Sequence, residues 1–138
     1  MKYHLVGLFI LLGVFFAMSL SQEKLQNSSR LAVLWASGDP DVAYKACFMY
    51  TRNAKRQEWF DEVVLIVWGP SARLLAGDKE LQASVKSMMD DGILVQACIA
   101  CADMYGVSQQ LAEMGIDVRG MGVPLTQYLK EGWKVLSF

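Results

Sequence analysis

The chain alternates between short, continuous apolar runs and longer segments in which apolar residues recur every three or four positions. The clearest apolar runs are LAVLWA at residues 31–36, VVLIVW at 63–68 and ILVQA at 93–97, and shorter strand-like segments follow at 116–119 and 133–138. Runs of this length that are apolar at successive positions are typical of parallel strands covered on both faces. The pattern therefore predicts five strands.

Helix signals fill the segments between these runs. Asp39 and Pro40 suit the cap and first position of a helix that should end near Glu58. Ser71 is a plausible cap for a short helical segment at 72–76. Each predicted helix follows a strand, as in folds built from β-α-β units.

Three further helical segments complete the pattern. Asp78 should open a helix with apolar positions at Leu81, Val85 and Met88, ended by Gly92. A helical stretch after residue 98 should end at Gly115, and residues 126–132 can form a helical turn after a loop at 120–124.

Strands that alternate with helices predict an α/β fold, a three-layer α/β/α sandwich with a mostly parallel five-stranded sheet. In such sheets, sites form beyond the carboxyl ends of the strands. The loops at 37–40, 69–71, 98–101 and 120–124 should meet at that edge. Trp35 and Trp68 end their strands, so they either wall an apolar pocket beside Cys98 or belong to the core.

The N-terminus has the layout of a secretory signal peptide. A short lead containing Lys2 is followed by an apolar stretch at 5–20, and polar residues begin at Ser21. We expect a signal peptide at 1–21, a linker at 22–30 and one domain at 31–138. Export would place the domain in the periplasm or outside the cell. The apolar stretch is shorter than the roughly 20 residues that span a bilayer, and membrane association is expected only if this segment stays uncleaved as an anchor.

Composition removes several classes of function. Lys and Arg number 13 against 14 Asp and Glu, and without Lys2 the balance is 12 − 14 = −2, with no basic stripe for nucleic acid. The one histidine, His4, lies in the leader. The domain therefore has no imidazole for a Ser-His or Cys-His dyad and lacks the commonest metal ligand.

Cys98 and Cys101 form a C-x-x-C at a predicted strand-to-helix turn. Unpaired N–H groups and the positive end of the dipole at a helix start favour a thiolate. The spacing suits a redox dithiol, a single nucleophile at Cys98 with Cys101 auxiliary, or a buried pair joined as an inert disulfide. Two thiols without histidine supply only half of a structural zinc site, so no metal is expected.

Other candidates have simpler interpretations. Cys47 lies on the apolar face of its helix and is expected in the core. Arg73 and Arg119 either approach the sheet edge, where they could stabilise a thiolate or persulfide, or are surface charges. The thioethers that would suit Cu(I) fall mostly at helical core spacing, which favours packing. These are Met88, Met89, Met104, Met114 and Met121.

Residues 98–107, CIACADMYGV, resemble the cysteine-bearing segment of the DsrE-like family, which includes the sulfur-relay proteins of Tus and Dsr type. The closing segment 132–138, GWKVLSF, and the order of elements from Leu31 onward are also similar to that family, so the resemblance covers nearly the whole domain. The positions that match the cysteine-bearing segment are Cys98, Ala100, Ala102, Gly106 and Val107.

The resemblance implies a five-stranded sheet between helices, a homo-oligomer such as a trimer or hexamer, and a cysteine that carries sulfur as a persulfide. Only Cys98 matches that cysteine. Two features depart from the family pattern. Cys101 stands where relay members often have a small residue, and the chain carries an export signal whereas the known relays act in the cytoplasm.

We therefore expect an exported DsrE-like protein that binds or transfers sulfur through Cys98. Cys101 would release the sulfur or protect Cys98 by forming a disulfide. Such a protein is a carrier or sulfurtransferase rather than a turnover enzyme, it needs no cofactor, and its partners are a sulfur donor and a sulfur acceptor. A thiol–disulfide oxidoreductase using Cys98 and Cys101, or a non-catalytic oligomeric binding module, are the alternatives.

Overall fold

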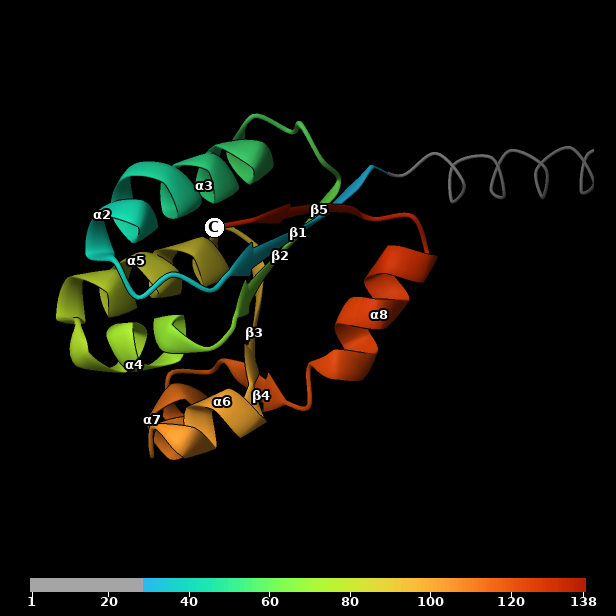
Figure 1. The fold of residues 1–138 in the computed structure, drawn as a ribbon. Helices are drawn as coiled ribbons and strands as arrows, with labels where there is room; N and C mark the ends of the chain where they lie inside the picture. The colour runs from blue at the N-terminus through green and yellow to red at the C-terminus, as the bar shows by residue number, and fades with distance from the viewer. Residues whose placement is uncertain (1–28) are drawn as a thin grey trace, which may run out of the picture.

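Five parallel strands form the single sheet of the computed structural model, which describes residues 29–138 (Figure 1). The order is β4-β3-β2-β1-β5, and every neighbouring pair is parallel. This confirms the predicted sheet. The strands are β1 (Arg30–Trp35), β2 (Glu62–Val67), β3 (Leu94–Cys98), β4 (Asp117–Arg119) and β5 (Lys134–Ser137).

The helices cover the two faces of the sheet unequally. One face carries α2 (Pro40–Val42), η1 (Ala43–Phe48), α3 (Met49–Arg56), α4 (Pro70–Gly77) and α5 (Lys79–Asp90), with α6 (Ile99–Met104) and α7 (Ser108–Glu113) beside β4. Helix α8 (Gly122–Lys130) stands by itself on the other face, as Figure 1 shows.

The expected signal peptide at 1–21 and most of the linker lie outside the described residues. Within residues 29–138, no helix combines the length and apolar character needed to cross a bilayer.

The predicted helix caps at Asp39 and Asp78 are confirmed. Asp39 accepts a hydrogen bond from the backbone N–H of Asp41 at 2.8 Å. Asp78 accepts from the N–H groups of Glu80 and Leu81 at 2.9 and 3.0 Å. Each carboxylate satisfies N–H groups that have no acceptor within the helix and opposes the positive end of its dipole. The segment from Pro40 to Arg56 is one continuous helix with a π-helical middle.

Side-chain alternation divides the interior into two cores. In β1, Leu31, Val33 and Trp35 face the larger core beneath helices α2 to α7. Ala32 faces the smaller core beneath α8. The buried members of the smaller core are Ala32, Val64, Ile66, Cys98, Met121 and Trp133.

The structure corrects the predicted role of Ser71. Gly69 is the cap of α4, and Ser71 lies inside the helix, fully buried. Its hydroxyl donates to the Trp35 carbonyl at 2.6 Å and accepts from the Trp68 N–H at 3.0 Å. Ser71 therefore ties β1 to the end of β2 instead of capping a helix, because burial makes those two backbone groups its nearest partners.

Two predicted boundaries were also wrong. The helical stretch after Cys98 is broken at Gly106, whose φ of 68° leaves the right-handed helical region, so α6 and α7 are separate helices. The loop expected at 120–124 is shorter, because α8 begins at Gly122 and includes Pro124 in its first turn, where proline's missing N–H costs no hydrogen bond.

Candidate functional site

Cys98 lies at the junction of β3 and α6, at the carboxyl edge of the sheet. It is the last residue of the strand and the cap residue of the helix, with extended backbone angles of φ −71° and ψ 111°. Cys101 follows in the first turn of α6. Ligand sites in parallel sheets form at this edge, and the two predicted site residues lie there.

The two thiols differ in exposure. The Cys98 side chain is buried, with 6% of the residue exposed, and Cys101 is partly exposed. Both belong to the smaller core, where Trp68 and Leu125 pack against it. Cys98 therefore has apolar neighbours and little exposure to solvent, while Cys101 lies at the surface of the same cluster.

The sequence left open whether Trp35 and Trp68 wall a pocket beside Cys98 or belong to the core, and the structure places them in different cores. Trp68 packs in the same core as Cys98. Trp35 is fully buried in the larger core on the opposite face of the sheet, against the edge of Phe48 at 4.8 Å. Successive strand residues point to opposite faces. Trp35 therefore points away from the side of the sheet that holds Cys98.

The environment of Cys101 disfavours its thiolate. Burial raises the pKa of the Cys101 thiol, and its side-chain hydrogen bond with Cys98 raises that pKa further. A hydrogen bond from the backbone of Gly69, at the start of α4, acts in the opposite direction. Cys47, Cys98 and Cys101 are all free thiols. No disulfide joins Cys98 to Cys101 in this structure, and the two thiols lie in the same apolar cluster.

Helix α6 is shorter than the sequence indicates. It has six residues and ends at Met104, because Gly106 breaks the stretch that was expected to reach Gly115. Its first-turn N–H groups lack acceptors within the helix, as at any helix start. A helix of this length has few aligned peptide dipoles to add to them. The backbone hydrogen bond from Gly69 is a local contact that favours the Cys101 thiolate.

A chain of polar side chains lies on the same face of the sheet as Cys98. The Tyr128 hydroxyl donates to Gln96 at 2.8 Å, and the Gln96 amide donates to Asp117 at 2.9 Å. Asp117 accepts from Arg119 Nε at 2.8 Å. Gln96 is buried, and burial raises the pKa of Tyr128, which keeps that hydroxyl a donor. Sequence reasoning missed this row of hydrogen-bonded side chains, although Gln96 is the one polar residue in the apolar run at 93–97.

Neither predicted arginine has an observed contact with a thiol. Arg119 is the register partner of Cys98 on the adjacent strand, but its Nε donates to Asp117. Arg73 is exposed on α4, with its guanidinium 5.1 Å from the centre of the Tyr105 ring. Among residues 29–138, no group of three or more His, Cys, Asp or Glu side chains comes together.

Cys47 is a core residue, as predicted. It is fully buried in the larger core, and burial raises the pKa of its thiol to about 12. The methionines fit the packing interpretation only in part. Met88 and Met121 are fully buried, whereas Met104 is 84% exposed.

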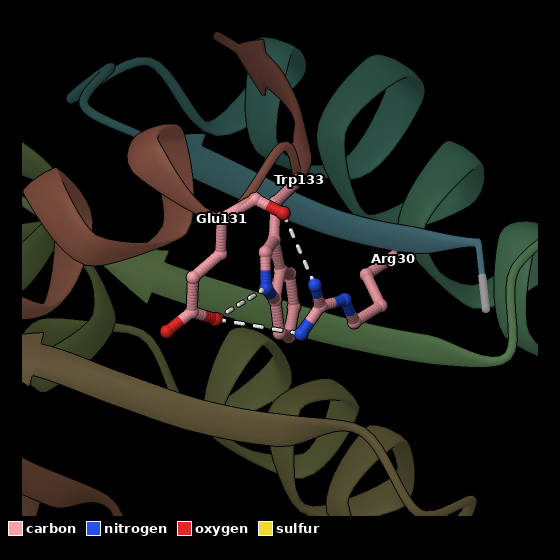
Figure 2. A network of polar contacts seen from close by, with 3 residues as sticks. All are labelled: Arg30, Glu131 and Trp133. Carbon is pink, nitrogen blue, oxygen red and sulfur yellow. Dashed lines mark hydrogen bonds and ion pairs between the residues drawn. The ribbon is translucent and has the colours of Figure 1, made fainter. Parts of the chain in front are cut away.

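A second polar cluster occupies the opposite edge of the sheet, where the strands begin (Figure 2). The Arg30 guanidinium donates to the Glu131 carbonyl at 3.1 Å and pairs with the Glu131 carboxylate at 3.4 Å. Trp133 Nε1 donates to the same carboxylate at 3.3 Å, and the guanidinium stacks 5.0 Å from the Trp133 ring. This cluster joins β1 to the end of α8, far along the strands from the thiols.

Comparison with known proteins gives a family match and several structural matches. Residues 53–138 match the DsrE/DsrF-like family. One match is the structure of a conserved protein of unknown function, BT1422 from Bacteroides thetaiotaomicron, whose sequence is 37% identical to this one. The TM-score is 0.76, and the match covers 80% of this chain and 95% of that chain. Comparison with curated proteins gives no match.

Two more distant structures share the fold. The YchN protein from E. coli is 17% identical, with a TM-score of 0.64, and the match covers 80% of this chain and 99% of that one. A protein of unknown function, MTH1491 from Methanobacterium thermoautotrophicum, is 18% identical, with a TM-score of 0.67 and the same two coverages. At this level of identity, the similarity concerns the fold.

Proposed function

Because the chain belongs to the DsrE/DsrF-like family, we propose that it binds sulfur as a persulfide on Cys98 and transfers it to an acceptor. The family membership supports a role related to sulfur relay. The observation that carries the assignment to Cys98 is its place at the end of β3 and the start of α6, on the carboxyl edge of the sheet.

The loading step is an exchange at sulfur. The Cys98 thiolate attacks the outer sulfur of a small persulfide or polysulfide donor, R–S–SH. The new bond is Cys98 Sγ–S, the donor S–S bond breaks, and the donor leaves as the thiolate R–S⁻. Transfer repeats the exchange, with an acceptor thiolate attacking the outer sulfur and Cys98 leaving as thiolate. No electrons are gained or lost overall, so no cofactor is required.

The surroundings of Cys98 support a protected sulfur. Its side chain is 6% exposed and packs in the core that includes Trp68 and Leu125. Apolar neighbours suit a polarisable sulfur chain. The low exposure of Cys98 would hinder bulky thiols that remove the sulfur prematurely and would favour small sulfur donors.

Intact mass after incubation with inorganic polysulfide tests the proposal. Immediately after mixing, wild type and Cys47→Ala should gain the mass of one or more sulfur atoms, and reduction with a thiol should remove the gain. Cys98→Ser should not gain it. A gain that persists in Cys98→Ser would contradict the assignment to Cys98.

A second candidate is a thiol–disulfide oxidoreductase, favoured by the place of Cys98 and Cys101 one helical turn apart in the same apolar cluster. It predicts a reversible two-electron couple with both cysteines and no dependence on sulfur donors. Redox titration with glutathione buffers, read by mass, separates the two functions. An oxidoreductase would reduce a disulfide substrate at a rate that added polysulfide leaves unchanged.

We also propose that the protein is a homo-oligomer, for which a trimer or hexamer is the expected size. The sparsely covered side of the sheet exposes apolar side chains around α8, including Leu94 at 48%, Leu129 at 57% and Val123 at 69%. Exposed apolar groups of this kind are typical of interfaces. Light scattering on the purified protein measures the mass directly, and Leu129→Glu should shift a true oligomer toward monomer.

The signal-like leader supports a place outside the cytoplasm, in the periplasm or the medium. The donor and acceptor would then be small molecules or proteins of that compartment. Cell fractionation of the full chain tests this placement, and mass analysis of the recovered protein shows whether the leader is cleaved.

A further inference from the structure

The second thiol of the site has no role in loading Cys98. Cys101 lies one helical turn from Cys98 and in contact with it, at the surface of the same apolar cluster. A carrier that only accepts and passes on one sulfur needs one cysteine. The adjoining thiol therefore calls for a chemical explanation.

Resting on the persulfide function proposed above, we propose a further activity: Cys101 releases the sulfur held on Cys98 as hydrosulfide and leaves a Cys98–Cys101 disulfide. The protein would then convert sulfane sulfur to sulfide whenever no acceptor takes it. A dithiol reductant would return it to the starting state.

The release step balances in atoms and electrons. The Cys101 thiolate attacks the inner sulfur, Cys98 Sγ, of the Cys98–S–SH persulfide. A Cys98–Cys101 S–S bond forms, the Sγ–SH bond breaks, and HS⁻ leaves with the electron pair of the broken bond. The outer sulfur is reduced from the sulfane to the sulfide level, and the two cysteines are oxidised to a disulfide. No external oxidant or reductant takes part in this step.

The geometry permits the bond with small movement. Cys98 caps α6, and Cys101 is the third residue of the helix. Side chains three positions apart across a helical turn have Cβ atoms about 5–6 Å apart, and a disulfide needs about 4 Å. A cap side chain already points toward the third residue of its helix. A shift of roughly 1–2 Å at the start of a short helix is therefore sufficient.

The unequal burial determines how the disulfide is reduced. Cys98 is 6% exposed, whereas Cys101 is partly exposed. A thiolate of a dithiol reaches Cys101 Sγ more readily, forming a mixed disulfide there and releasing Cys98 as thiolate. The second thiol of the reductant then attacks its own sulfur in the mixed disulfide and frees Cys101. This order restores the loading cysteine first, which suits a repeating cycle.

Single-turnover measurement on the loaded protein tests the proposal. Wild type, Cys101→Ser and Cys101→Ala are loaded with inorganic polysulfide without oxygen and desalted, and sulfide and intact mass are followed together. Wild type should release one sulfide for each persulfide and end two hydrogens lighter than the reduced protein. Both variants should keep the added sulfur, with sulfide release slowed by about a hundredfold or more, because an intramolecular attack is lost.

The outcomes separate this activity from the proposed function. Loading of Cys98 in the Cys101 variants, with sulfide release as fast as in wild type, would overturn the role of Cys101 and leave the carrier function standing. Failure of both Cys101 variants to gain sulfur would overturn the carrier function itself. Dithiothreitol should restore the capacity of the spent wild type to load again, and glutathione disulfide should form a mixed disulfide with Cys101 in Cys98→Ser, releasing one glutathione thiolate.

Discussion

Cys98 is more deeply buried than Cys101, although the two thiols are in contact across the first turn of α6. The end of β3 carries Cys98 into the core beneath α8, and the helix then turns Cys101 toward the surface. We therefore expect access to differ by size, with small sulfur species reaching Cys98 and larger thiols meeting Cys101 first.

This relationship leads to a prediction for the pH dependence of sulfide release. The attacking group is the Cys101 thiolate, and burial raises the pKa of that thiol. Below the raised pKa, the thiolate fraction, and with it the rate, should rise about tenfold per pH unit. The rate should keep rising past the pH at which an ordinary cysteine titrates. Measurement of sulfide release from loaded wild type between about pH 7 and about pH 9.5 checks this.

The nearby charges define the control for that pH profile. The charged groups on α4, α6, β4 and α8, the elements next to the thiols, are Arg73, Asp103, Asp117, Arg119 and Lys130. Arg73→Gln should leave the slope unchanged, because the guanidinium is engaged with the Tyr105 ring. A release rate that is flat across this range would contradict attack by the Cys101 thiolate.

A second prediction concerns Gly69, which has φ 64° and ψ −131° at the start of α4. A Cβ there would meet nothing within 4 Å, so the cost of Gly69→Ala comes from the backbone angles alone. That cost should be about 1–3 kcal/mol in the free energy of unfolding, measured with urea. The distorted backbone should also weaken its hydrogen bond to Cys101, raise the pKa of that thiol further and slow its alkylation.

Gly77→Ala is the matched control for Gly69→Ala. Gly77 lies in the same helix, its added Cβ also meets nothing within 4 Å, and it does not have positive φ. Alanine favours helix over glycine by about 1 kcal/mol, so this variant should be as stable as wild type or more stable. Equal losses in the two variants would mean that backbone angle is not the cause.

The strands and caps were predictable because their signals are local. The apolar runs at 31–36, 63–68 and 93–97 could only be satisfied by a sheet covered on both faces, and Asp39 and Asp78 precede helices that need N–H acceptors. The position of Cys98 followed from the same logic, since it ends the third run. These features depend on residues within a few positions of each other.

The features that sequence reasoning missed depend on distant partners. Trp35 and Trp68 both end apolar runs, and only strand register shows that Trp35 packs on the face opposite Cys98. In the sequence Ser71 has the position of a helix cap. In the folded protein its hydroxyl is buried and donates to the Trp35 carbonyl, which is 36 residues away in the chain. Gln96 forms hydrogen bonds with Asp117 and Tyr128, which come close to it only in the folded protein.

A third prediction concerns the cluster of Arg30, Glu131 and Trp133 (Figure 2). Arg30→Ala removes the bond to the Glu131 carbonyl and the stacking on Trp133, and should lower the free energy of unfolding by about 1–2 kcal/mol. Glu131→Ala leaves that carbonyl and the stacking in place, and should cost about 0.5–1 kcal/mol, as expected for a solvent-exposed pair. Urea unfolding measures both variants.

Lys45→Ala is the control for the Arg30 cluster. Its ion pair with Asp41 spans one helical turn, and both side chains are more than 70% exposed, at 74% and 73%. Its loss should therefore change stability by less than about 0.5 kcal/mol. If Arg30→Ala were no more destabilising than Lys45→Ala, the cluster would not be what holds the end of α8 to β1.

The last prediction concerns stability at high pH. Burial in the larger core raises the pKa of Cys47 from 9.0 to about 12 in the folded protein, so the thiol ionises more easily when unfolded. Stability is therefore complete below about pH 9 and falls between pH 9 and about 12, by up to about 1.4 kcal/mol per pH unit from this group. Tyr44, whose pKa is raised to about 12, loses its proton over a similar range.

Cys47→Ala isolates the contribution of the thiol. At pH 7 the variant should be less stable than wild type by about 1–2 kcal/mol, because a buried sulfur is lost from a packed core. Between about pH 9 and pH 10.5 its stability should decline less steeply, so the two urea midpoints converge, while Tyr44 leaves a residual slope in both. If the stabilities of wild type and Cys47→Ala fell in parallel over this range, Cys47 would ionise equally readily in the folded and unfolded protein. That result would contradict the prediction, which follows from the full burial of the Cys47 side chain.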